Sequence, residues 1–104
     1  MEPHIIFALC CAYNQIDFDD NKSERNARER GLPFTMVAEF DFSTALVAED
    51  LRSDYPEHRF VALGYLGGRL YVLCFTSIAE GVRVISLRKA NTREVNIYAT
   101  EKAH

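Results

Sequence analysis

The sequence predicts an α+β fold in which two helices precede an antiparallel sheet of about four strands and a last helix follows it. Three observations support this class. The run Arg69–Thr76 is almost entirely apolar, as expected for a central strand. Gly67 and Gly68 just before it give a strong hairpin signal. The segment Asn21–Arg30 is rich in Glu and Arg, follows two aspartates and ends at Gly31, which is typical of an exposed helix.

The N-terminal part of the domain is predicted to be helical after one short strand. Residues Ile16–Phe18 alternate and give that strand, and Asp19 or Asp20 caps the helix that follows. Thr35 is the expected cap of a second, short helix. The buried side of this helix is expected to consist of Phe34, Val37, Ala38 and Phe40.

The strands of the sheet are predicted after Asp41, where the pattern changes from helical to extended. In chain order the expected strands are Thr44–Glu49, His58–Tyr65, Arg69–Thr76 and Val82–Leu87. Asn91 or Thr92 then caps a helix that runs to about Glu101. We expect the helices to pack on one face of the sheet, and the other face to meet a partner or to line a cleft.

Composition indicates one ordinary globular domain with unevenly placed charges. The chain has 104 residues, of which 48% are hydrophobic and 26% are charged, and its formal charge is −3. Six acids and one base lie in Glu39–Glu57, whereas six bases and one acid lie in His58–Arg93. The overall charge does not indicate a nucleic-acid binder, but the uneven placement allows a cationic site, or pairing between the two halves.

Residues 1–14 differ from the rest and are interpreted as an N-terminal extension to a single domain of residues 15–104. The apolar run Ile5–Tyr13 is too short to span a bilayer and lacks a basic flank, so neither a membrane helix nor a signal peptide is predicted. The chain has three cysteines, Cys10, Cys11 and Cys74. An odd number does not indicate a disulfide framework, and their spacing is not that of zinc ligands. This cysteine usage fits a reducing cytoplasm.

Cations gather at the end of the last predicted strand. Arg88 and Lys89 follow the apolar run Val82–Leu87, where the next helix holds them in place. Fixed cations suit a phosphate, and a solvated turn is the plainer alternative. Arg83 interrupts the run, so its charge needs a cleft or a partner, for which Glu57 is the candidate. A solvated helix face is the interpretation of Lys22, Arg28 and Arg30.

A second group is Glu57, His58 and Arg59 at the start of a predicted strand. In a regular strand Glu57 and Arg59 share one face, and His58 points to the other. His58 is either a general acid or base near neutral pH or simply exposed. The sequence has no phosphate-binding glycine loop, nucleophile elbow or metal-ligand cluster. A cofactor-free site of Arg, Lys, Glu and His suits RNA cleavage, in which the 2′-hydroxyl of the RNA is the nucleophile.

Several segments together resemble the BrnT family of ribonuclease toxins. They cover about Ile16 to Tyr98, and the RVISLRKA sequence among them is quite specific to the family. In order they are FDxxKxxxN (Phe18–Asn26), Gly31 with Phe34, EFDF (Glu39–Phe42), TALVxED (Thr44–Asp50), DYxExR (Asp54–Arg59), ALG (Ala62–Gly64), GRLYVLxFT (Gly68–Thr76) and VRVISLRKANxRE (Val82–Glu94).

The resemblance implies a function and a partner. Family members resemble RelE-type ribonucleases in fold, belong to bacterial type II toxin–antitoxin pairs and cleave RNA without a metal or cofactor to stop translation. The implied partner is a BrnA antitoxin, which binds DNA through a ribbon-helix-helix domain. The toxin would therefore meet DNA only through the antitoxin, and it would act in the cytoplasm without a membrane.

The resemblance also implies site residues. Glu57 and Arg59 fall in the family's ExR motif, and its RxIS-RKA motif supplies Arg83, Arg88 and Lys89. In this assignment Glu57 carries a proton or orients Arg83, and the cations bind the scissile phosphate. Further RNA contacts are expected from Arg30, His58 and Arg93.

Two places depart from the family pattern. Glu29 and Arg30 replace a Lys-His pair common before the glycine, and Ile78 replaces an arginine common in its loop. If that histidine is the acid or base, only Arg30 or His58 could substitute for it. Two alternatives to a toxin ribonuclease stay open: a weak or inactive homologue that binds its antitoxin or RNA, and an ordinary interaction domain.

Overall fold

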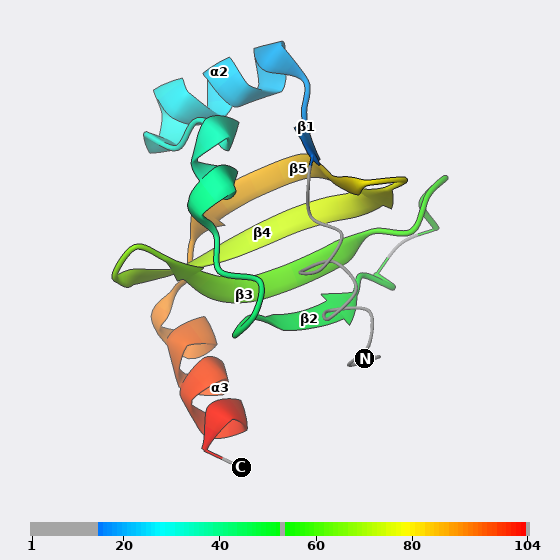
Figure 1. The fold of residues 1–104 in the computed structure, drawn as a ribbon. Helices are drawn as coiled ribbons and strands as arrows, with labels where there is room; N and C mark the ends of the chain where they lie inside the picture. The colour runs from blue at the N-terminus through cyan, green and yellow to red at the C-terminus, as the bar shows by residue number, and fades with distance from the viewer. Residues whose placement is uncertain (1–14, 53, 104) are drawn as a thin grey trace.

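A five-stranded mixed sheet forms the centre of the protein (Figure 1). The computed structural model describes residues 15–52 and 54–103, so the predicted extension of residues 1–14 lies outside the described residues. From one edge to the other, the strands are β1 (Gln15–Asp17), β5 (Gly81–Lys89), β4 (Arg69–Ile78), β3 (Phe60–Leu66) and β2 (Leu46–Glu49). Strands β2 to β5 form the predicted antiparallel meander, and the α+β class is confirmed.

Strand β1 makes the sheet mixed, because it pairs parallel to β5. The prediction of a purely antiparallel sheet of about four strands is wrong in this respect, although a short strand was expected near Ile16–Phe18. Gln15 lies opposite Gly81, where the backbones approach so closely that a Cβ on Gly81 would clash with the Gln15 carbonyl. Glycine at this position therefore allows β1 to dock.

The first helix, α2 (Asp20–Arg30), confirms both predicted end signals. Asp19 is the N-cap, and its carboxylate accepts hydrogen bonds from the backbone N–H groups of Asn21 at 2.8 Å and Lys22 at 3.1 Å. Gly31 ends the helix with φ of 72°, a left-handed conformation that costs glycine little.

The second predicted helix is a short 3₁₀-helix, η1 (Phe34–Glu39). Its N-cap is Pro33, so the expectation that Thr35 caps an α-helix here is wrong. Phe40 follows at once in extended conformation and forms a bridge to Leu66 of β3. Only six residues separate Pro33 from that bridge, and the tighter 3₁₀ geometry suits so short a segment.

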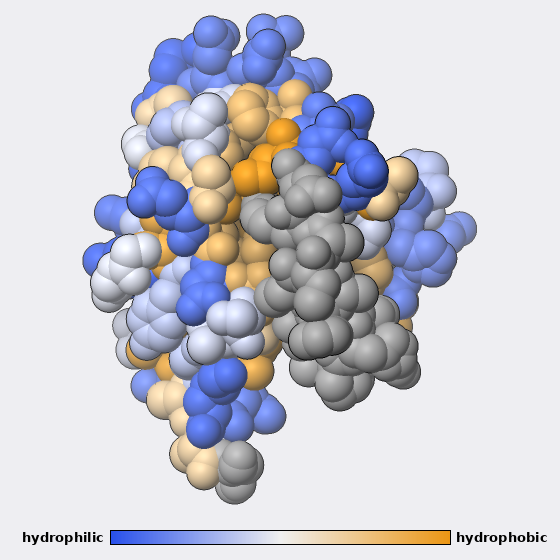
Figure 2. Space-filling view, viewed as in Figure 1, coloured by the Kyte–Doolittle hydropathy of each residue, from blue (hydrophilic) through white to orange (hydrophobic). Residues whose placement is uncertain are grey.

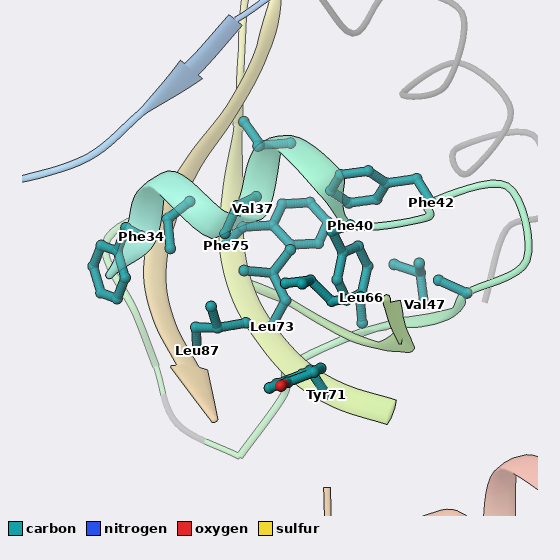
Figure 3. Packing of buried hydrophobic residues seen from close by; sticks show 14 of the residues in the cluster. Phe34, Val37, Phe40, Phe42, Val47, Leu66, Tyr71, Leu73, Phe75 and Leu87 are labelled. Atoms are coloured by element: carbon teal, nitrogen blue, oxygen red, sulfur yellow. The ribbon is translucent and has the colours of Figure 1, made fainter. Parts of the chain in front are cut away.

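The hydrophobic core lies between the sheet and the N-terminal helices (Figure 3). Phe34 and Val37 from η1 and Leu73 and Phe75 from β4 are all at most 1% exposed. The ring of Phe75 packs edge to face against that of Phe42, with the centroids 5.8 Å apart. The 3₁₀-helix η1 therefore covers one face of the sheet, which is part of the packing that the sequence predicted.

A β-bulge in β5 decides which side chains reach the opposite face. Val84 lies opposite Phe75 and Ser86 opposite Cys74, so Ile85 is an extra residue on β5. This opposite face is called the second face below. It consists of Val61 and Leu63 of β3, Val72, Cys74 and Thr76 of β4, and Arg83, Ser86 and Arg88 of β5.

The last helix, α3 (Thr92–Lys102), confirms the predicted cap but not the predicted packing. Asn91 and Glu94 form a capping box. Beyond this cap, α3 runs past the end of the sheet and does not cover a face (Figure 1). Tyr98 anchors it, because its hydroxyl donates to the Thr44 carbonyl at 2.9 Å and its ring packs on Tyr65. No helix in the described ranges is both long and apolar enough to cross a membrane.

Candidate functional site

Arginines predicted for the site gather on the second face of the sheet. Arg83 lies directly opposite Thr76, and Arg88 lies farther along β5 on the same side. Arg59 directly precedes Phe60, the first residue of β3 that pairs with β4. It therefore extends the second face beside Thr76, on the side away from Arg83, and is counted with that face below. At a strand spacing of about 4.8 Å, the backbones of Arg59 and Arg83 are roughly 10 Å apart. Guanidinium groups from two regions of the chain thus reach the same surface, an arrangement suited to phosphate.

A carboxylate holds each of these arginines. Asp17 Oδ2 lies 2.6 Å from Arg83 Nη2, and Glu57 Oε1 lies 3.2 Å from Arg59 Nε. The Arg59 guanidinium also stacks on the ring of Tyr55, 4.1 Å from its centroid. The expected pair between Glu57 and Arg83 is wrong, because parallel docking of β1 places Asp17 directly opposite Arg83. Glu57 therefore orients Arg59 and not Arg83.

Arg88 is held by two hydrogen bonds at the junction of β5 and α3. Its Nη1 and Nη2 donate to the two carboxylate oxygens of Glu94 at 2.8 and 2.7 Å. Glu94 also accepts the Asn91 N–H at 2.9 Å within the capping box. The hydrogen bond between the side chains lowers the pKa of Glu94 and raises the pKa of Arg88. The strand-to-helix junction thus fixes this cation in space, as the sequence predicted.

A further arginine, Arg52, was not among the predicted site residues. Its Nε and Nη2 each donate to the Asp50 carboxylate at 2.8 Å, and the Tyr55 hydroxyl donates to the same carboxylate at 3.3 Å. The Asp50 side chain is 4% exposed, whereas that of Arg52 is 76% exposed. The positive charge of Arg52 slightly opposes the rise in the pKa of Arg88. The Asp-x-Arg spacing was the sequence signal that could have found this pair.

The Asp50–Arg52 pair predicts an acid-sensitive contribution to stability. Hydrogen bonds from Arg52 hold the pKa of Asp50 well below its ordinary value of 3.8. Because the folded-state pKa is depressed, the pair stabilises the fold above about pH 4, and this contribution is lost as the pH falls further. In urea unfolding near neutral pH, the free energy of unfolding should be larger for the wild type than for Asp50→Asn. This difference in free energy should become smaller below about pH 4. A gap that does not depend on pH would contradict the prediction.

His58 lines an acidic pocket that it shares with Arg59, and no other arginine among the described residues lines that pocket. Its Nδ1 lies 2.5 Å from Glu49 Oε2, and 82% of its side chain is exposed. The pocket has a volume of about 200 Å³. The acidic and basic residues that line it are Glu49, Asp50, Asp54, Glu57, His58 and Arg59. The four carboxylates of this pocket surround His58, so its side chain is poorly placed to bind an RNA phosphate.

The remaining predicted residues lie away from the arginines of the second face. Lys89 is opposite Tyr71, on the helix-covered side of β5. Arg30 ends α2, with its Nη1 3.4 Å from the Leu87 carbonyl, and Arg93 is exposed on α3. Within the part of the chain that the structure describes, no group of three or more His, Cys, Asp or Glu side chains is placed to hold a metal ion.

A family model matches most of the chain. It is described as the ribonuclease toxin BrnT of type II toxin–antitoxin systems, and it matches residues 18–94. No curated protein and no solved structure matches the chain. The matched range contains Arg52, Arg59, Arg83 and Arg88, and it ends at Glu94, the partner of Arg88.

Proposed function

The chain belongs to the BrnT family of ribonuclease toxins of type II toxin–antitoxin systems, and we propose that it is a metal-independent endoribonuclease whose cleavage of RNA inhibits translation. The observation that carries the proposal is the group of arginines on the second face, each oriented by its own carboxylate. Orientation before the substrate arrives is what electrostatic stabilisation of a transition state requires.

Metal-free cleavage of RNA requires alignment of the chain, transfer of protons and stabilisation of a phosphorane with added negative charge. We place the scissile phosphate between Arg59 and Arg83, with Arg88 on the adjoining surface. Arginine stays protonated in proteins and cannot act as a base, so Glu57 is the proposed proton carrier.

The proposed reaction is an attack within the RNA chain. Glu57 accepts the proton of the 2′-hydroxyl, the 2′-oxygen bonds to phosphorus, and the bond from phosphorus to the 5′-oxygen breaks. Water protonates the departing 5′-oxygen. The products are a 2′,3′-cyclic phosphate and a 5′-hydroxyl. Lys89 lies on the other side of β5 and has no part in this contact.

A protein antitoxin is the partner that a type II family implies. We propose that this partner is a BrnA-like protein with a ribbon-helix-helix domain, and that the pair acts in the cytoplasm. The toxin would then bind RNA directly and DNA only through its partner. A RelE-like fold stays a prediction. An adjacent reading frame for a short basic protein with a ribbon-helix-helix pattern would support the pairing.

Binding without cleavage is a second candidate function. The carboxylates beside Arg59, Arg83 and Arg88 reduce the positive potential of the second face. His58, which could replace the missing histidine of the family pattern, contacts Glu49 instead. These observations favour a homologue that still binds its antitoxin but does not cleave RNA.

Incubation of the purified protein with RNA in EDTA tests the proposed enzyme. We expect products with 2′,3′-cyclic phosphate and 5′-hydroxyl ends, and no cleavage of the same oligonucleotide with 2′-O-methyl groups. Glu57→Gln should slow cleavage by about 10²-fold or more, the usual contribution of a general acid or base. Products with 5′-phosphate ends would contradict the mechanism. No cleavage by the folded wild type, even with ribosomes added, would contradict the enzyme and favour the binding function.

A further inference from the structure

A groove of about 230 Å³ lies between α2 and the edge of β5, beyond the three residues of β5 that pair with β1. The side chains on its α2 wall follow the spacing i, i+3, i+4, i+7 and i+8, so they form one face of the helix. They are Lys22, Arg25, Asn26, Glu29 and Arg30. Ile85 and Ser86, the two residues at the β-bulge, line the wall formed by β5.

Hydrogen bonds from α2 hold the two walls of this groove together. The buried side chain of Asn26 donates to the Leu32 carbonyl at 2.7 Å and to the Leu87 carbonyl of β5 at 2.9 Å. Ser23 Oγ accepts the Phe34 N–H at 2.9 Å and so ties the helix to η1. The cations on the α2 wall are therefore carried by a helix whose position against β5 is fixed.

The charge of the groove is positive and is not neutralised locally. In residues 15–52 and 54–103, neither Lys22 nor Arg25 nor Arg30 forms an ion pair with a carboxylate. Glu29 is the acid among the lining residues. The arginines of the second face differ, because each has a carboxylate partner. Figure 2 shows the strongly hydrophilic surface over α2. Unneutralised cations in a concave surface attract and retain anions.

The groove continues the second face around the edge of β5. Ser86 lines the groove, lies opposite Cys74 on the second face and precedes Arg88 by two residues. A chain bound over Arg83 and Arg88 would cross β5 at Ser86 and meet Lys22 and Arg25 next. We propose that the groove is a phosphate subsite for a nucleotide that flanks the cleavage position in single-stranded RNA. This inference rests on the proposed function.

A matched pair of variants on α2 tests this subsite. Arg25 and Arg28 are both exposed arginines of α2, and only Arg25 lines the groove. Binding of a 2′-O-methyl single-stranded RNA, which the proposed reaction cannot cleave, is measured by fluorescence anisotropy over a salt series. We expect Arg25→Ala and Lys22→Ala each to weaken binding about tenfold at low salt, as for the loss of a charge-assisted hydrogen bond. The slope of log K against log salt should fall by about 0.7 for each, whereas Arg28→Ala should match the wild type.

The outcomes separate this inference from the proposed function. If Arg25→Ala and Lys22→Ala bind RNA as Arg28→Ala does while the wild type still cleaves RNA, the subsite is wrong and the ribonuclease stands. If both variants keep RNA binding but lose binding to the antitoxin, the groove holds an acidic segment of a protein, and the RNA subsite is again wrong. If the folded wild type neither binds nor cleaves RNA, both proposals are wrong.

Discussion

An Arg83→Lys/Arg88→Lys variant is expected to cleave RNA at least about 10²-fold more slowly than the wild type, although its net charge is unchanged. Removing one oriented donor from the stabilisation of an oxyanion costs on the order of 10² to 10³ in rate. Lysine keeps the charge but not the planar fork. It cannot reproduce the two hydrogen bonds that hold Arg88 on Glu94, and the charge would no longer be fixed in place. Single-turnover cleavage of labelled RNA in EDTA measures the effect.

The matched control for this variant is Arg28→Lys/Arg69→Lys. Arg28 lies on α2 outside the groove, and Arg69 begins β4 at the β3–β4 hairpin. Both are exposed, so the control makes the same chemical change twice away from the second face. Equal cleavage rates for the two double variants would show that the second face is not the site. Thermal unfolding of both variants checks that the comparison is between folded proteins.

Asn26→Ala is expected to destabilise the fold by about 2–4 kcal/mol, because one substitution removes both hydrogen bonds that the buried Asn26 amide donates to backbone carbonyl groups. The Asn26 amide donates to Leu32 and Leu87, which lie 6 and 61 positions away in the sequence. It thereby closes the turn after α2 and joins the helix to β5. Urea unfolding monitored by circular dichroism gives the free energy of unfolding.

The control for Asn26→Ala lies on the same helix. Asn21 is an exposed asparagine in the first turn of α2, and Asn21→Ala should change the free energy of unfolding by less than about 0.5 kcal/mol. Asn26→Asp should be worse than Asn26→Ala, because a carboxylate would face two carbonyl oxygens in a buried site. Equal effects at positions 21 and 26 would contradict the structural role of Asn26.

Patterns within a few residues determined much of the secondary structure and part of the site. Asp19 and Gly31 mark the two ends of α2, and the capping box at Asn91 marks the start of α3. These ends can be predicted from the sequence because a cap involves only the next three or four residues. The register between β3 and β4 is set by the hairpin at Gly67-Gly68, which is a signal within a few residues. The family resemblance carried by these segments was confirmed, and most of the arginines it indicated lie on one face.

Only the tertiary structure decided which groups meet across the fold. Asp17 pairs with Arg83 because β1 docks parallel to β5, and no local pattern encodes that docking. Period-two alternation places a strand residue on one face or the other, and the bulge at Ile85 interrupts that alternation within β5. The groove beside α2 likewise depends on Asn26 reaching Leu87. Sequence patterns report interactions a few residues long, whereas the partners of buried and charged groups are chosen by packing between distant segments.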